Sequence, residues 1–193
     1  VRSLDIGVCH IYNKKFNDWD AQKLLAYIHN ATDDRLYAIA QLIRLGVDLG
    51  MIFNSTKIDM FFLEKFKNIV DYEKILKAGI GDEKVLRKAK VMGFSDKYIG
   101  QVWGKTEGEM YEIRRKFGIM PVYKMIDTCA SEFESYIPYF YSTYEDENES
   151  IVSQKKKGIV LGSGPIRIGQ GIEFDYSTVH AIWSIREAGY EAI

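Results

Sequence analysis

The stretch from Phe94 to Gly118, FSDKYIGQVWGKTEGEMYEIRRKFG, decides the fold predicted for this chain. Near its start is Ser95, a residue type that often caps helices. A glycine turn follows, and Thr106 after it is a second residue of the capping type. Serine and threonine at such positions accept the unpaired N–H groups of a helix start. The stretch therefore predicts a short helix, a tight turn and a following helix.

The same pattern occurs 47 residues earlier without a gap. Glycines, apolar positions and capping residues all coincide: Gly46 with Gly93, Val47 with Phe94, Asp48 with Ser95, Ile52 with Ile99, Asp59 with Thr106, Leu63 with Met110, and Phe66 with Ile113. Two such helix-turn-helix-like repeats would bury one another's apolar faces. We therefore predict a mainly α protein with a helical bundle domain over residues 17–120.

The spacing of apolar residues also predicts the helices that precede and follow the glycine turns of the repeats. Apolar residues recur at three- and four-residue intervals, which is typical of a helix with one buried face. One helix is expected after Asp18 or Asp20 and another after Asp33 or Asp34, ending at Gly46. The apolar positions are Leu24, Leu25, Tyr27 and Ile28 in the first, Leu36, Ile39, Ala40 and Ile43 in the second, and Phe62, Leu63, Phe66, Ile69 and Val70 in a longer helix after Asp59.

Residues 121–157 break the helical pattern. They contain Pro121 and Pro138, and seven aromatic residues follow neither a two-residue nor a helical period. A solvated linker would not carry so many aromatic side chains. We expect an irregular, largely buried connector that packs against flanking domains, with only residues 145–157 as an exposed link.

Residues 158–193 predict the start of an α/β domain. An apolar run at Ile159–Leu161 is followed by a glycine-rich loop, an amphipathic helix from about Glu173 to Glu187, a stop signal at Gly189 and the beginning of another strand. A parallel sheet needs several such units. We therefore expect a truncated, Rossmann-like βα unit, and expect the chain, which begins with Val1, to be a middle piece of a longer protein.

The loop glycines Gly162, Gly164, Gly169 and Gly171 are the candidate nucleotide-binding residues. Backbone N–H groups between a strand and a helix can hold a phosphate. The spacing, however, matches neither the GxGxxG fingerprint nor the Walker A motif. An equally weighted alternative is that these glycines only allow a tight turn.

No catalytic or metal-binding residue is predicted. His10, His29 and His180 have no ligand-type residue at a suitable spacing, and Cys9 and Cys129 match no metal motif. A net charge of -1 and the lack of a long apolar run give no reason to expect nucleic acid or a membrane as a partner. A helix-turn-helix nucleic-acid-binding module remains the alternative, although Glu107 and Glu109 would repel phosphates.

Two stretches resemble one protein family, the large chain of carbamoyl-phosphate synthetase. They are Pro121–Lys124 with Asp127–Ala130, Glu132–Phe133 and Tyr141–Glu145, which resemble its connector, and Gly162–Tyr176, GSGPIRIGQGIEFDY, which resembles the opening of its synthetase halves. The helical block is also similar, through Asp33–Leu36 and Ile58–Leu63.

The resemblance implies a domain order and a parent activity. Residues 1–16 would end the first synthetase half, 17–120 would form the oligomerisation domain, 121–157 the connector, and 158–193 the start of the second half (pre-ATP-grasp). The parent would be a cytoplasmic, ATP-dependent carbon–nitrogen ligase that forms carbamoyl phosphate for pyrimidine and arginine synthesis from bicarbonate, glutamine-derived ammonia and two ATP. It would use Mg²⁺ (or Mn²⁺) and K⁺, and a small amidotransferase subunit as partner.

For this chain alone, the resemblance implies a scaffold that self-associates through the helical domain. It implies no activity and no bound cofactor, because the nucleotide clamp of the family lies in later parts of each half.

Overall fold

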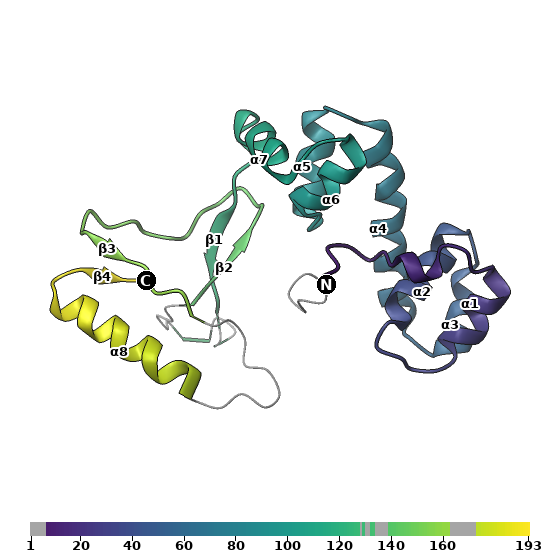
Figure 1. Ribbon diagram of the computed structural model, residues 1–193, viewed down its shortest axis with the longest axis horizontal. Coiled ribbons are helices and arrows are strands. Elements are labelled where there is room, and N and C mark those ends of the chain that lie inside the picture. The colour runs from purple at the N-terminus through teal and green to yellow at the C-terminus, as the bar shows by residue number, and fades with distance from the viewer. Residues whose placement is uncertain (1–6, 128, 130–131, 134–138, 163–172) are drawn as a thin grey trace. The chain divides into compact units, whose positions relative to one another are not determined.

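The computed structural model describes residues 7–127, 129, 132–133, 139–162 and 173–193 (Figure 1). The chain divides into two compact units, Val1–Glu149 and Ser150–Ile193, which are described separately. The mainly α fold is confirmed. The first unit holds a short 3-10 helix, η2 (Lys14–Phe16), and the helices α1 (Ala21–Ile28), α2 (Arg35–Arg44), α3 (Leu49–Thr56), α4 (Met60–Ala78), α5 (Glu83–Val91), α6 (Asp96–Trp103) and α7 (Glu107–Lys116).

The repeat predicted from sequence is present in the helix boundaries. Helices α3 and α6 begin at Leu49 and Asp96, and α4 and α7 begin at Met60 and Glu107. The matched side chains of Ile52 and Ile99, and of Leu63 and Met110, are all fully buried. Most of the predicted caps also function as such: the side chains of Asp20, Asp48, Asp59, Ser95 and Thr106 each accept a backbone N–H at the start of a helix. Asp34, which precedes α2, makes no such bond.

Two hydrophobic cores fill this unit, and α4 belongs to both. The first core lies among α1, α2, α3 and the first half of α4, and includes Leu24, Ile52 and Leu63. The second core lies among α5, α6, α7 and the second half of α4, and includes Leu76 and Ile99. In Figure 1, α4 runs from one group of helices to the other. Its 19 residues therefore serve two cores, whereas α7, with 10, serves one.

The connector differs from the sequence expectation. Strands β1 (Val122–Met125) and β2 (Phe140–Thr143) pair antiparallel, with Val122 opposite Thr143 and Met125 opposite Phe140. The neighbouring aromatic side chains are exposed rather than buried: Tyr139 by 66%, Phe140 by 41% and Tyr141 by 45%. These rings are exposed within this chain, and their expected packing against flanking domains stays a prediction.

The second unit contains a small parallel βα arrangement. Strand β3 (Lys157–Gly158) pairs with β4 (Glu191–Ala192), and α8 (Glu173–Glu187) lies between them in sequence. The helix has the predicted bounds, but the strand precedes the apolar run, and Leu161 is 90% exposed. The face of α8 that packs on the strand includes Ile185, whose Cγ2 would lie 2.9 Å from a Cβ at Gly158.

Helices α3 and α6 both end in a residue with a left-handed backbone conformation. Lys57 is the one non-glycine residue with a left-handed backbone (φ 57°) in the described part of the chain, and Gly104 holds the matching position (φ 66°). This conformation brings Cβ close to the backbone of any residue but glycine. We expect Lys57→Gly to raise the free energy of unfolding by roughly 0.5–1 kcal/mol in urea denaturation.

The reciprocal change is the control. Gly104→Lys puts a side chain into the same conformation and should lower the free energy of unfolding by roughly 1 kcal/mol. Loss of stability in Lys57→Gly, or none in Gly104→Lys, would contradict the assigned strain.

Candidate functional site

The predicted glycine loop lies mostly outside the described residues. Gly164, Gly169 and Gly171 fall in residues 163–172, and only Gly162 is described. Apart from its chain neighbours, no atom of the described residues lies within 4 Å of a Cβ built on Gly162. The phosphate-binding role of this loop therefore stays a prediction.

A buried ionic cluster, not found from sequence, occupies the middle of the helical domain. Glu73 of α4 is 6% exposed and accepts hydrogen bonds from Arg44, from Nε to Oε2 (2.9 Å) and from Nη2 to Oε1 (2.7 Å). His10 Nε2 lies 2.8 Å from the same Oε1. Arg44 Nη2 also donates to the carbonyl of Ile11 (2.8 Å). We call Glu73, Arg44 and His10 the Glu73 cluster.

The Glu73 cluster joins the two cores. Arg44 ends α2, which packs in the first core, while the His10 ring stacks on Tyr98 of α6 with ring centroids 3.8 Å apart. The His10 ring centroid is also 5.1 Å from that of Phe94, a second-core residue. A segment before the first helix thus reaches both cores. His10, for which the sequence predicted no ligand role, is a core residue whose Nε2 lies within hydrogen-bond distance of Glu73.

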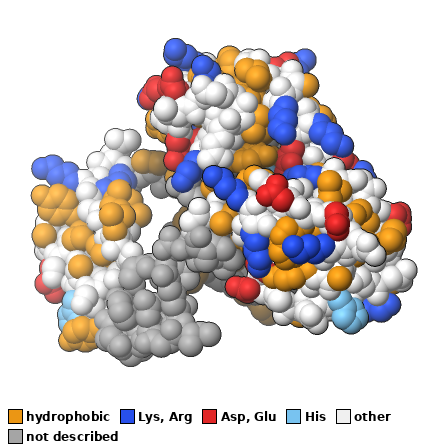
Figure 2. Space-filling model, turned by 45° about the vertical axis from the view of Figure 1, so that its right-hand side comes forward, with side chains coloured by type: hydrophobic (Ala, Val, Ile, Leu, Met, Phe, Trp, Pro, Cys, Tyr) orange, Lys and Arg blue, Asp and Glu red, His pale blue; other side chains and the backbone are white. Residues whose placement is uncertain are grey.

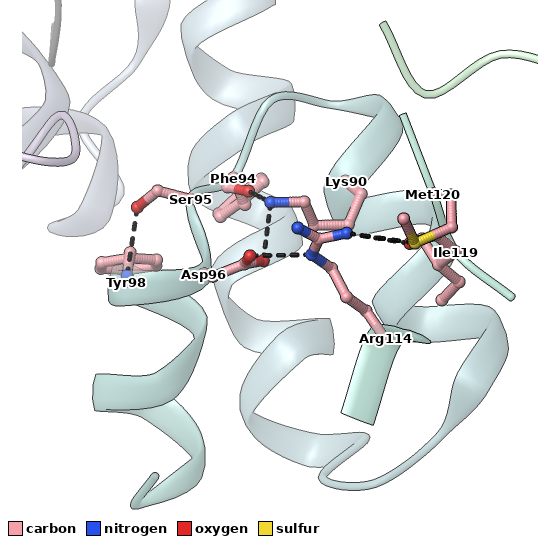
Figure 3. Close-up of polar contacts among 8 residues, drawn as sticks. All are labelled: Lys90, Phe94, Ser95, Asp96, Tyr98, Arg114, Ile119 and Met120. Atoms are coloured by element: carbon pink, nitrogen blue, oxygen red, sulfur yellow. Dashed lines mark hydrogen bonds and ion pairs between the residues drawn. The ribbon is translucent and has the colours of Figure 1, made fainter. Parts of the chain in front are cut away.

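A second buried cluster lies within the second repeat (Figure 3). Asp96, the first residue of α6, lies between Lys90 and Arg114, which are 6% and 7% exposed. Arg114 Nε donates to Asp96 Oδ2 (2.8 Å), and Lys90 Nζ forms an ion pair with Oδ1 (2.8 Å). Both cations also donate to backbone carbonyls, Lys90 to Phe94 (2.8 Å) and Arg114 to Ile119 (3.2 Å). We call Lys90, Asp96 and Arg114 the Asp96 cluster.

Ion pairing lowers the pKa of the carboxyl group in each cluster. Burial by itself would raise the pKa of the Glu73 carboxyl, but the Arg44 and His10 side chains outweigh it and lower that pKa to about 2. Asp96 behaves in the same way: burial opposes ionisation, yet Lys90 and Arg114 hold its pKa below the ordinary value. For Lys90, burial prevails and lowers the pKa, with Asp96 opposing it. The carboxylates of both clusters are therefore ionised at neutral pH.

These clusters are suited to holding structure rather than to catalysis. Their carboxylates are bound by cations from other helices, and a general base needs a carboxylate that can reach a substrate. Within the described residues, no group of three His, Cys, Asp or Glu side chains could hold a metal ion. In the same part of the chain, no helix is long and apolar enough to cross a membrane.

The Glu73 cluster predicts how stability depends on pH. Because the folded state lowers the pKa of Glu73 from 4.5 to about 2, this group stabilises the fold above pH 4.5, and the effect is lost as pH falls toward 2. The linkage amounts to about 3 kcal/mol. We expect Glu73→Gln to lower the free energy of unfolding at pH 7 by about 3 kcal/mol and to reduce its decline between pH 4.5 and 2.

The matched control is Glu64→Gln, an exposed carboxylate on the same helix. It should leave both the stability at pH 7 and the acid profile nearly unchanged. A Glu73→Gln protein with the acid profile of the unaltered chain would show that another group is responsible.

Each of the two units matches the model of a known protein family. The model of the carbamoyl-phosphate synthetase large chain oligomerisation domain matches residues 1–118, which contain the two repeats and both ionic clusters. The model of the carbamoyl phosphate synthase preATP-grasp domain matches residues 154–193, which contain β3, α8 and β4. The first match alone covers more than half of the chain. The chain therefore belongs to the carbamoyl-phosphate synthetase large-chain family.

Proposed function

We propose that this chain is the structural segment of a glutamine-dependent carbamoyl-phosphate synthetase large chain that joins its two synthetase halves. The order of the two family matches carries the proposal, since an oligomerisation domain at residues 1–118 is followed by a preATP-grasp domain at 154–193. In this proposal the helical domain and connector hold the halves together and mediate self-association.

The complete protein would be an ATP-dependent ligase of the cytoplasm. It would form carbamoyl phosphate from bicarbonate, two ATP and ammonia that a small amidotransferase subunit releases from glutamine, with Mg²⁺ (or Mn²⁺) and K⁺ bound by the parent. The product would feed pyrimidine and arginine synthesis. The present residues would contribute positioning rather than chemistry, because the charges of both clusters are engaged with one another.

Exposed apolar side chains support self-association. Phe61 and Phe62, at the start of α4, are each 57% exposed and contact one another edge to face, with ring centroids 5.4 Å apart. Tyr139 and Tyr141 of the connector are also exposed. Hydrophobic side chains are visible at several places on the face shown in Figure 2. Exposed aromatic side chains such as the Phe61–Phe62 pair can contact a second copy of the protein.

The nucleic-acid-binding alternative rests on the helix-turn-helix-like geometry of α6 and α7. Its recognition helix would be α7, which begins with Glu107 and Glu109. Glu109 completes a capping box with Thr106, so its carboxylate is fixed at the end of the helix that would approach phosphates. This arrangement favours the structural role.

We expect the purified chain to self-associate and to lack ATPase activity. Sedimentation velocity over low to high micromolar concentrations should show reversible growth beyond the monomer, and ATP turnover with Mg²⁺ and K⁺ should equal a buffer control. A strict monomer at the highest concentration would contradict the self-association role, and turnover that persists through purification would contradict the scaffold role.

A duplex DNA titration at low salt distinguishes the scaffold proposal from the nucleic-acid-binding alternative. The scaffold proposal predicts no tight binding. Tight binding that weakens steeply as salt rises would favour the helix-turn-helix function instead.

A further inference from the structure

The β1–β2 hairpin buries little of its own surface. Each of its strands has four residues, and none of these residues is fully buried. Tyr139, Phe140 and Tyr141 lie exposed within or beside β2. A single two-stranded hairpin is marginally stable at best in water. The order of this hairpin therefore depends on contacts outside its two strands.

Tyr144, the residue after β2, supplies such a contact. Its ring centroid lies 4.9 Å from Lys90 Nζ and 5.8 Å from Arg114 Cζ, and the ring packs against the second core. Burial raises the pKa of its hydroxyl. A cation within about 6 Å of the face of an aromatic ring is attracted to it. The ring thus attaches the end of β2 to the second repeat.

The two cations next to the ring are already held in place. Lys90 and Arg114 are almost fully buried, both pair with Asp96, and both donate to backbone carbonyls (Figure 3). Tyr144 therefore meets a preformed site, and its binding does not have to order two mobile side chains. A preorganised contact of this kind loses less entropy when it forms.

The segment after Tyr144 returns to β1. The Glu149 N–H donates to the carbonyl of Tyr123 (2.8 Å), and Lys124 Nζ lies 3.3 Å from Glu145 Oε2. These contacts tie the segment to the hairpin. The hairpin and the segment therefore form one piece, which Tyr144 attaches to the second repeat.

We propose that Tyr144 is a latch, which holds the hairpin on the second repeat when closed and releases it when open, while both helical cores stay folded. Opening breaks the contacts of one side chain, whereas unfolding the second repeat exposes a whole core. Such local opening requires less free energy than global unfolding. The connector would therefore alternate between an attached and a released state. These contacts all lie within residues 90–149, so the latch is independent of the proposed function.

Amide hydrogen exchange in the intact chain, followed by NMR, tests the latch. The Ile126 N–H, which donates to the carbonyl of Tyr139 (3.0 Å), and the Glu149 N–H report on the hairpin, while the Ile99 N–H reports on the second core. Tyr144→Ala should make exchange at Ile126 and Glu149 about tenfold faster or more, and should change exchange at Ile99 by less than about twofold.

Two conservative variants separate the aromatic contact from apolar packing. Tyr144→Phe keeps the ring face and should leave exchange at Ile126 within about twofold of the unaltered chain. Tyr144→Leu keeps an apolar side chain but has no ring, and should make this exchange about threefold faster or more. The matched control Tyr139→Ala removes a hairpin tyrosine ring that is 66% exposed, and should change the exchange by less than about twofold.

Four outcomes would overturn the proposal. They are unprotected Ile126 and Glu149 amides in the unaltered chain, unchanged exchange of these amides in Tyr144→Ala, an equal acceleration at Ile99 in that variant, and equal exchange rates in Tyr144→Phe and Tyr144→Leu.

Discussion

The ionised Glu73 in the middle of α4 is the constraint on which the helical domain depends. A buried carboxylate is costly unless cations and hydrogen bonds replace its water. Arg44 and His10 supply these contacts at 2.7–2.9 Å, and they come from different parts of the chain. The side chains can meet only when α2, α4 and the segment before α1 are all in place. The stacking of His10 on Tyr98 adds α6 to this requirement.

The two repeats share a backbone pattern but differ in the length of their second helix. Their buried apolar pairs and their turns match, with Gly46 at φ 80° and Gly93 at φ 87°. The first repeat continues into the long α4, which also forms a wall of the second core, while α7 ends before Gly118 at φ 64°. The chain then returns through the connector and places Tyr144 over the second repeat.

Local signals in the sequence predicted the helices well, because spacing and capping act over a few residues. Asp59 and Thr106 begin their helices as expected, and α8 has the predicted bounds. The Glu73 cluster was missed because His10 and Glu73 are 63 positions apart, a separation at which no local pattern exists. The β1–β2 pair was missed because its strands are only four residues long and do not alternate between polar and apolar. Three of the four loop glycines lie outside the described residues, so the candidate site itself stays a sequence prediction.

We infer that α4 and the Glu73 cluster make the two cores one cooperative unit. Native-state hydrogen exchange in increasing denaturant measures this directly, because it gives an opening free energy for each amide. We predict that slowly exchanging amides of Leu42 and Leu63 in the first core and of Ile99 and Met110 in the second converge on one opening free energy. Two values that stay apart by more than about 1 kcal/mol would show that the cores open independently and that the Glu73 cluster does not couple them.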